Sequence, residues 1–150
     1  MRRHSERGST LPEMAIALVA VLLLIFGIID FGRAMYTYGF VSYLARQGAR
    51  WAVVRGSTSC TNSNNELPDC NATEAEVQSY VQSLSEGATV ATGFTVNVTY
   101  PSCPPDVASG TNAPGCTVAV EVTYPFKFIM GLLPKEQLDI SSTSTMVISQ

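Results

Sequence analysis

The chain has 150 residues, of which 46% are hydrophobic and 14% charged, with a net charge of -3 and a pI near 5.0. An acidic chain lacks the basic surface that general nucleic-acid binding requires, so that class of partner is excluded. The apolar excess is concentrated in one block near the N-terminus, and the polar remainder has roughly the 100 residues of a common small domain. Composition therefore predicts one membrane segment followed by one small domain.

The apolar block is the run Met14–Ile29, which contains no charged side chain. Together with Leu11 and Pro12 it approaches the roughly 20 residues that span the hydrocarbon core of a bilayer. We expect a transmembrane helix over about residues 12–29. Glu13 lies at its start, and a carboxylate at the edge of a hydrocarbon segment is costly enough to call for a partner or a role.

Two readings of Glu13 remain open on the residues alone. Thr10 and Glu13 have the spacing of a capping box, and Pro12 is tolerated in the first turn of a helix, where its missing N–H has no partner anyway. In that reading Glu13 only stabilises the helix start. In the other reading Glu13 serves assembly with a neighbouring chain.

Orientation follows from the charges that flank the apolar run. Arg2, Arg3 and Arg7 precede it, and Asp30 is the first charged residue after it. Basic residues favour the cytoplasmic side, so we expect a cytoplasmic N-terminus and an external C-terminal domain. Residues 1–8 form a short basic leader that we expect to be removed.

All four cysteines lie in the part placed outside the membrane, and an even count in a small exported domain indicates disulfides. Three connectivities are possible. We favour local pairing, Cys60 with Cys70 and Cys103 with Cys116, because each pair brackets one polar loop. A metal site is disfavoured because the one histidine, His4, lies across the membrane and neither pair has a tight zinc-ligand spacing.

The helical pattern continues beyond the apolar run. Residues at alternating spacings of four and three form a stripe, widened by Val41 and Gly48. The stripe consists of Phe31, Met35, Tyr38, Ser42, Ala45, Ala49 and Ala52. It predicts one helix from about Pro12 to about Val54, roughly 60 Å long and twice the hydrocarbon thickness, whose outer half packs on the external domain. The small residues in the outer half permit a close approach of other elements.

The external domain is predicted to be α+β. Gly56–Asn71 reads as a polar loop, and a capping box at Thr73 and Glu76 opens a short helix to about Ser85. Alternating patterns predict strands over Phe94–Tyr100 and Thr117–Tyr124, and we expect a third strand over Leu138–Ile148. The expected fold is a long N-terminal transmembrane helix continuing into a small external domain with a three- to four-stranded antiparallel sheet. Its parts are the leader 1–8, the helix 9–54 and the domain 55–150.

Pro125–Pro134 is the second most apolar stretch and is too short to span a membrane. We expect it to cover the sheet edge or to pack against the long helix. The functional alternative is contact with the bilayer surface or with a neighbouring subunit.

The N-terminal third carries a resemblance to a known family. Gly8, then Ser9 as a new first residue and Glu13 as the fifth, followed by an apolar helix, resembles the cleavage site of type IV prepilins and pseudopilins. Phe26–Tyr36 and Ala45–Val54 resemble the TadE-like family of tight-adherence (Flp-type) pilus assembly proteins. The resemblance implies that a prepilin peptidase cuts after Gly8 on the cytoplasmic side, and that Glu13 pairs with the new N-terminus of a neighbouring subunit.

The function implied by the resemblance is that of a minor pilin or pseudopilin in the bacterial inner membrane. Its expected partners are the lipid bilayer, the prepilin peptidase, and other pilin-like subunits with their assembly machinery. One alternative is an unprocessed single-pass assembly factor. Another is a soluble secreted binding domain released after Ala34, since Gly32 to Ala34 has the small-residue spacing of a signal-peptidase site.

Enzymatic chemistry finds no support in the residues. The external part has no histidine, no glycine-rich phosphate loop and no nucleophile motif, and its acidic residues are scattered. We therefore expect neither catalysis nor a cofactor, a metal or a small-molecule substrate.

Overall fold

The computed structural model describes residues 10–59, 71–86, 88, 93–129 and 137–149. Two helices and three strands follow one another along these ranges. They are α1 (Thr10–Val53), α2 (Glu74–Leu84), β1 (Thr95–Ser102), β2 (Thr117–Lys127) and β3 (Gln137–Val147). The predicted α+β fold, a long apolar N-terminal helix followed by an antiparallel sheet, is confirmed.

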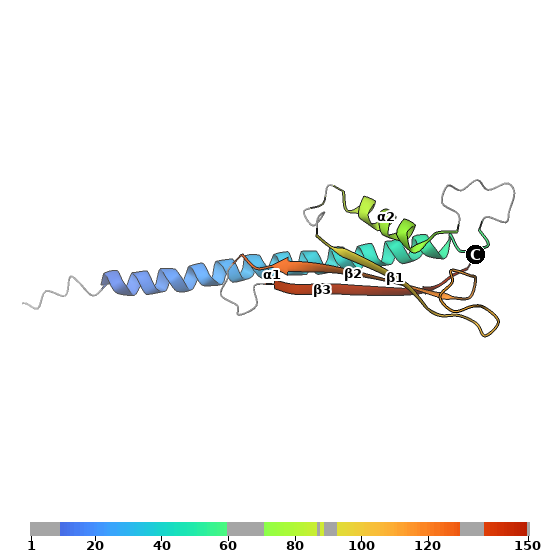
Figure 1. The fold of residues 1–150 in the computed structure, drawn as a ribbon. Coiled ribbons are helices and arrows are strands. Elements are labelled where there is room, and N and C mark those ends of the chain that lie inside the picture. The colour runs from blue at the N-terminus through green and yellow to red at the C-terminus, as the bar shows by residue number, and fades with distance from the viewer. Residues whose placement is uncertain (1–9, 60–70, 87, 89–92, 130–136, 150) are drawn as a thin grey trace, which may run out of the picture.

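Helix α1 is continuous over 44 residues, which corresponds to about 66 Å. Its first half extends away from the rest of the molecule as a lone helix (Figure 1). Every residue from 11 to 29 is exposed. This half is long and apolar enough to cross a membrane, and its leucines and isoleucines are not covered by any other part of the chain that the structure describes.

The three strands form one antiparallel sheet in the order β1-β2-β3. Strand β2 alternates as a half-buried strand should: Val118, Val120 and Val122 are fully buried, and the residues between them are partly exposed. In the register of the sheet, Val120 lies opposite Val98 on β1 and opposite Ser144 on β3. The valines of β2 therefore form the centre of the core.

Strand β2 runs three residues beyond the predicted end at Tyr124 and includes Pro125. Pairing with β1 ends at Thr123, whereas pairing with β3 continues to Lys127. From Thr123 onward β2 is thus an edge strand on one side, and an edge position tolerates a residue that lacks an N–H. The apolar segment contributes Phe126, which is 1% exposed, to this extension.

The outer half of α1 lies lengthwise along one face of the sheet, and α2 packs against α1 and β1 (Figure 1). Gly48 lies at the closest approach. A Cβ added there would be 2.6 Å from Cγ2 of Val81 on α2 and 3.1 Å from Cγ1 of Val120 on β2. The predicted role of small residues in the outer half is therefore confirmed at this position.

The prediction that the first three residues of the stripe face the external domain was wrong. Phe31, Met35 and Tyr38 are 67%, 56% and 54% exposed. The side of α1 that meets the domain instead includes Asp30 and Thr37, both buried. The stripe was selected for apolarity, but lipid and protein interiors are both apolar, so apolarity alone does not identify the side of a helix that faces protein.

Helix α2 begins with the predicted capping box. The carboxylate of Glu76 accepts hydrogen bonds from the backbone N–H of Thr73 at 2.6 Å and from its hydroxyl at 2.9 Å, and the Thr73 hydroxyl accepts from the Glu76 N–H at 3.4 Å. The backbone hydrogen bond from Thr73, then its hydroxyl, lower the pKa of Glu76. One turn further along α2, the ring of Tyr80 stacks on Trp51 with centroids 5.1 Å apart.

One predicted disulfide is present, between Cys103 and Cys116. It closes the loop between β1 and β2 at the end of the domain remote from the lone half of α1. The other predicted pair, Cys60 with Cys70, lies outside the described residues.

Candidate assembly site on the N-terminal helix

Glu13 lies in the first turn of α1 and is exposed. Its neighbours along the helix are apolar and equally open, with Leu11 78% and Met14 69% exposed. Within the described ranges, its carboxylate has no hydrogen bond and no ion pair. Glu13 is therefore an acid placed among apolar side chains, and any compensation of its charge inside a bilayer has to come from outside the described part of this chain.

The two residues of the predicted processing site, Gly8 and Ser9, lie outside the described residues. Helix α1 already includes Thr10. The capping-box reading of Glu13 needs Thr10 as the flanking residue before the helix, whereas Thr10 lies within α1.

A second acid, Asp30, lies at the other end of the apolar run and has the opposite surroundings. It is 6% exposed. Its two carboxylate oxygens accept hydrogen bonds from the backbone N–H of Ile129, at 3.1 and 3.2 Å. Arg33, one turn further along α1, donates to the same carboxylate at 3.1 Å. Asp30 thus fastens the end of the β2 extension to α1.

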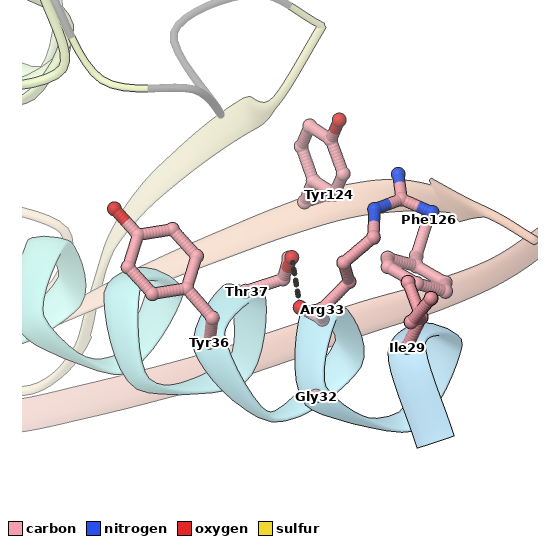
Figure 2. A pocket seen from close by; sticks show the side chains of 7 residues that line it. All are labelled: Ile29, Gly32, Arg33, Tyr36, Thr37, Tyr124 and Phe126. Carbon is pink, nitrogen blue, oxygen red and sulfur yellow. Dashed lines mark hydrogen bonds between the residues drawn. The ribbon is translucent and has the colours of Figure 1, made fainter. Parts of the chain in front are cut away.

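Arg33 connects the helix to strand β2. Its side chain rises from α1 toward the rings of Tyr124 and Phe126, and Figure 2 shows the guanidinium beside both. The guanidinium carbon lies 5.2 Å from the ring centroid of Phe126, within the range of a cation–π contact. Its Nη1 also donates to the backbone carbonyl of Lys127 at 3.5 Å. One turn further along α1, the hydroxyl of Thr37 donates a hydrogen bond to the backbone carbonyl of Arg33 at 2.9 Å (Figure 2).

Two hollows adjoin at Arg33. One, of about 370 Å³, is lined mainly by aromatic and aliphatic groups that include Ile29, Tyr36 and Phe126 (Figure 2). The other, of about 260 Å³, is lined by Arg33, Lys127 and three neighbours. Among the residues with described positions, no three His, Cys, Asp or Glu side chains gather closely enough to hold a metal ion.

The sequence context of Glu13 identifies it as a candidate site residue, whereas that of Asp30 indicates only the orientation of the chain. The signal that could have identified its structural role is the pair Asp30 and Arg33 at a spacing of three residues, which places opposite charges on one side of a helix. Its partner, the N–H of Ile129, lies 99 residues away, and no local pattern reveals such a contact. The prediction that the apolar segment packs against the long helix is confirmed for Phe126–Ile129, and the rest of that segment lies outside the described residues.

Comparison with known proteins places the strongest similarity in this same part of the chain. No curated protein and no solved structure matches the chain. One family model does match, over residues 8–50, which include Gly8, Glu13 and the Asp30–Arg33 pair. That model describes TadE-like proteins, so the resemblance seen in the sequence is confirmed over residues 8–50, where the chain is similar to this family.

Proposed function

We propose that this chain is a minor pilin or pseudopilin that takes part in assembling a tight-adherence (Flp-type) pilus. Its role is structural and not enzymatic. The observation that carries the proposal is the exposed Glu13 at the start of an apolar helix, which has no partner among the described residues and lies within the matched range 8–50.

In this proposal the chain is inserted in the inner membrane with its N-terminus in the cytoplasm, and a prepilin peptidase cuts after Gly8. Ser9 then carries a new positively charged amine, while α1 remains in the bilayer. Glu13 of one subunit pairs with the amine of a neighbour when the two helices are offset by about one turn, or roughly 5 Å. Pairing compensates two charges where either one alone is expensive.

The soluble alternative, with release after Ala34, fits the contacts of α1 poorly. A cut there removes Asp30 and Arg33, which hold Ile129 and the carbonyl of Lys127. It also interrupts a helix that runs without a break from Thr10 to Val53. The turn that follows β2 would lose this attachment to α1.

The first experiment is intact mass measurement and N-terminal sequencing of the protein purified from its native membrane. The proposal expects a chain that begins at Ser9. A chain that begins at Met1 supports the unprocessed assembly factor, and one that begins at Met35 supports the soluble domain. Either of these two results contradicts the proposal.

The second experiment separates processing from assembly. Glu13→Gln is expected to leave cleavage after Gly8 intact and to abolish incorporation or pilus production in a complementation assay. Glu86→Gln, which removes one negative charge from the exposed surface of the domain, is the matched control and is expected to assemble normally. Normal assembly by Glu13→Gln would remove the charge-pairing role.

A further inference from the structure

Helix geometry places one end of the external domain, the end nearest the apolar half of α1, at the membrane surface. From Glu13 to Asp30 α1 rises about 26 Å, close to the roughly 30 Å of a hydrocarbon core. The interfacial layer adds about 5 to 7 Å on each side. Arg33, about 4.5 Å beyond Asp30, therefore falls within the layer of lipid headgroups.

The Asp30 contact brings part of the sheet to the same level. The N–H of Ile129 is bound by Asp30, so the turn that follows β2 lies beside the end of the apolar run. The side chain of Ile129 is 57% exposed. An exposed isoleucine at this height borders on the acyl region of a bilayer and not on water.

The side chains around Arg33 have the mixed character of a lipid interface. Arg33 and Lys127 line one hollow of about 260 Å³. Within the described ranges, hydrogen bonds engage only Nη1 of Arg33, which leaves its other donors available. Asp30 offsets one of the two positive charges, so the hollow carries one net positive charge. Tyr36 and Tyr124 beside it have the amphipathic rings that are enriched at membrane interfaces.

We infer that Arg33, Lys127 and Ile129 form a lipid-binding foot of the external domain, in which the two cations bind the phosphate of an anionic phospholipid headgroup and Ile129 enters the adjoining acyl region. The inference rests on α1 as a membrane anchor and is independent of any role in a pilus. A failure of the pilus proposal therefore leaves it standing, and the reverse also holds.

The headgroup contact is tested with full-length protein in nanodiscs of equal parts phosphatidylglycerol and phosphatidylcholine. The measurement is the ratio of the two lipids retained on the protein after release into detergent. The double variant Arg33→Gln, Lys127→Gln is expected to lower the phosphatidylglycerol preference about 25-fold, or about fivefold for each cation. The double variant Arg33→Lys, Lys127→Arg keeps both positive charges and is expected to retain the preference for phosphatidylglycerol.

The matched control is Arg46→Gln with Arg50→Gln, which removes two exposed arginines from the same helix at least about 20 Å further from the membrane. It is expected to leave the lipid ratio unchanged. An equal loss in the control, or no preference in the unaltered protein, would overturn the headgroup assignment. Displacement of the lipid by inorganic phosphate at matched ionic strength would overturn it as well.

The acyl contact has an independent readout in tryptophan fluorescence. The chain has one tryptophan, Trp51, about 32 Å beyond Asp30 along α1. In vesicles of lipid brominated near the headgroup end of the acyl chain, Trp51 is expected to be unquenched. Ile129→Trp in a Trp51→Phe background is expected to be strongly quenched, and an unquenched Trp at position 129 would overturn insertion. Formation of the Cys103–Cys116 disulfide checks that each variant has folded.

Discussion

The two halves of α1, residues 10–29 and 30–53, belong to one continuous helix but have different surroundings. From residue 11 to residue 29 every side chain is exposed, whereas Val41, Leu44, Ala45 and Ala49 are fully buried beneath the sheet and α2. Apart from Thr10 and Glu13, the inner half is apolar around its circumference, and the outer half is buried on one side only. The difference shows that an apolar residue of this helix is exposed throughout the inner half, whereas in the outer half it is buried only on the side that faces the sheet and α2.

The largest expected effect comes from removing the same side chain in each half. Leu44→Ala empties a fully buried site and is expected to lower the free energy of unfolding of the external domain by about 2 to 5 kcal/mol. The matched control is Leu24, which is 63% exposed. Leu24→Ala should change the free energy of unfolding of the external domain by less than about 0.5 kcal/mol. Urea unfolding of the full chain in detergent, followed by Trp51 fluorescence, measures both. Equal effects would break the distinction between the two halves.

The boundary between the halves is tested at Asp30. Asp30→Ala removes the acceptor of the Ile129 N–H and the partner of Arg33. Hydrogen bonds to charged groups contribute about 1.5 to 3 kcal/mol, so amide exchange at Ile129 is expected to accelerate by roughly 10- to 100-fold. Asp139→Ala, at an exposed carboxylate that accepts from Gln137, is the control. Unchanged exchange at Ile129 in Asp30→Ala would show that the turn is held by other contacts.

A third comparison uses one substitution at two glycines of α1. Gly48→Ala places a methyl group 2.6 Å from Cγ2 of Val81 and is expected to cost about 1 to 3 kcal/mol through overpacking. Gly39 has open space around its Cα, so Gly39→Ala is expected to stabilise the helix by up to about 1 kcal/mol. Thermal unfolding of both variants gives the sign. Destabilisation by Gly39→Ala would indicate that a neighbouring chain occupies that space.

The smallest effects are expected at the start of α2, outside both halves. Thr73→Ala removes the cap of α2 and is expected to lower the free energy of unfolding by about 1 kcal/mol at neutral pH.

The stability of the α2 cap should also depend on pH. Because the pKa of Glu76 is lowered in the folded state, its ionised form stabilises the fold above its ordinary pKa of 4.5. This contribution is lost as the pH falls through the folded pKa. The advantage of the unaltered protein over Glu76→Gln should therefore shrink on acidification. A constant difference between pH 7 and pH 3 would exclude the linkage.

Local chemistry allowed much of the fold to be predicted from the sequence. The Thr73–Glu76 capping box identifies the start of α2 because both of its hydrogen bonds lie within four residues. The alternation in β1 and β2 identifies strands because a half-buried sheet imposes a period of two. The extension of β2 through Pro125 could not be predicted, since it depends on where β1 stops pairing.

The side of α1 that faces the domain was only half predicted. Ala45, Ala49 and Ala52 are buried as expected because there the sheet and α2 together cover a wide face of the helix. Nearer the membrane, polar side chains mark the protein-facing side: Thr37 and Asp30 are buried and make hydrogen bonds. The candidate site divides in the same way, with Glu13 found from its sequence context and Asp30 found only from its contact with a residue distant in the chain.

The unbroken course of α1 has a mechanical consequence. Because α1 is continuous from its membrane-spanning half into the external domain, the domain tilts together with the inner half of the helix. Transmembrane helices tilt by about 20° on average, and the end of α1 at Val53 is about 35 Å beyond Asp30. Such a tilt displaces that end sideways by roughly 12 Å. Any contact that selects the direction of tilt at the bilayer surface therefore also aims the far end of the domain toward a particular neighbour.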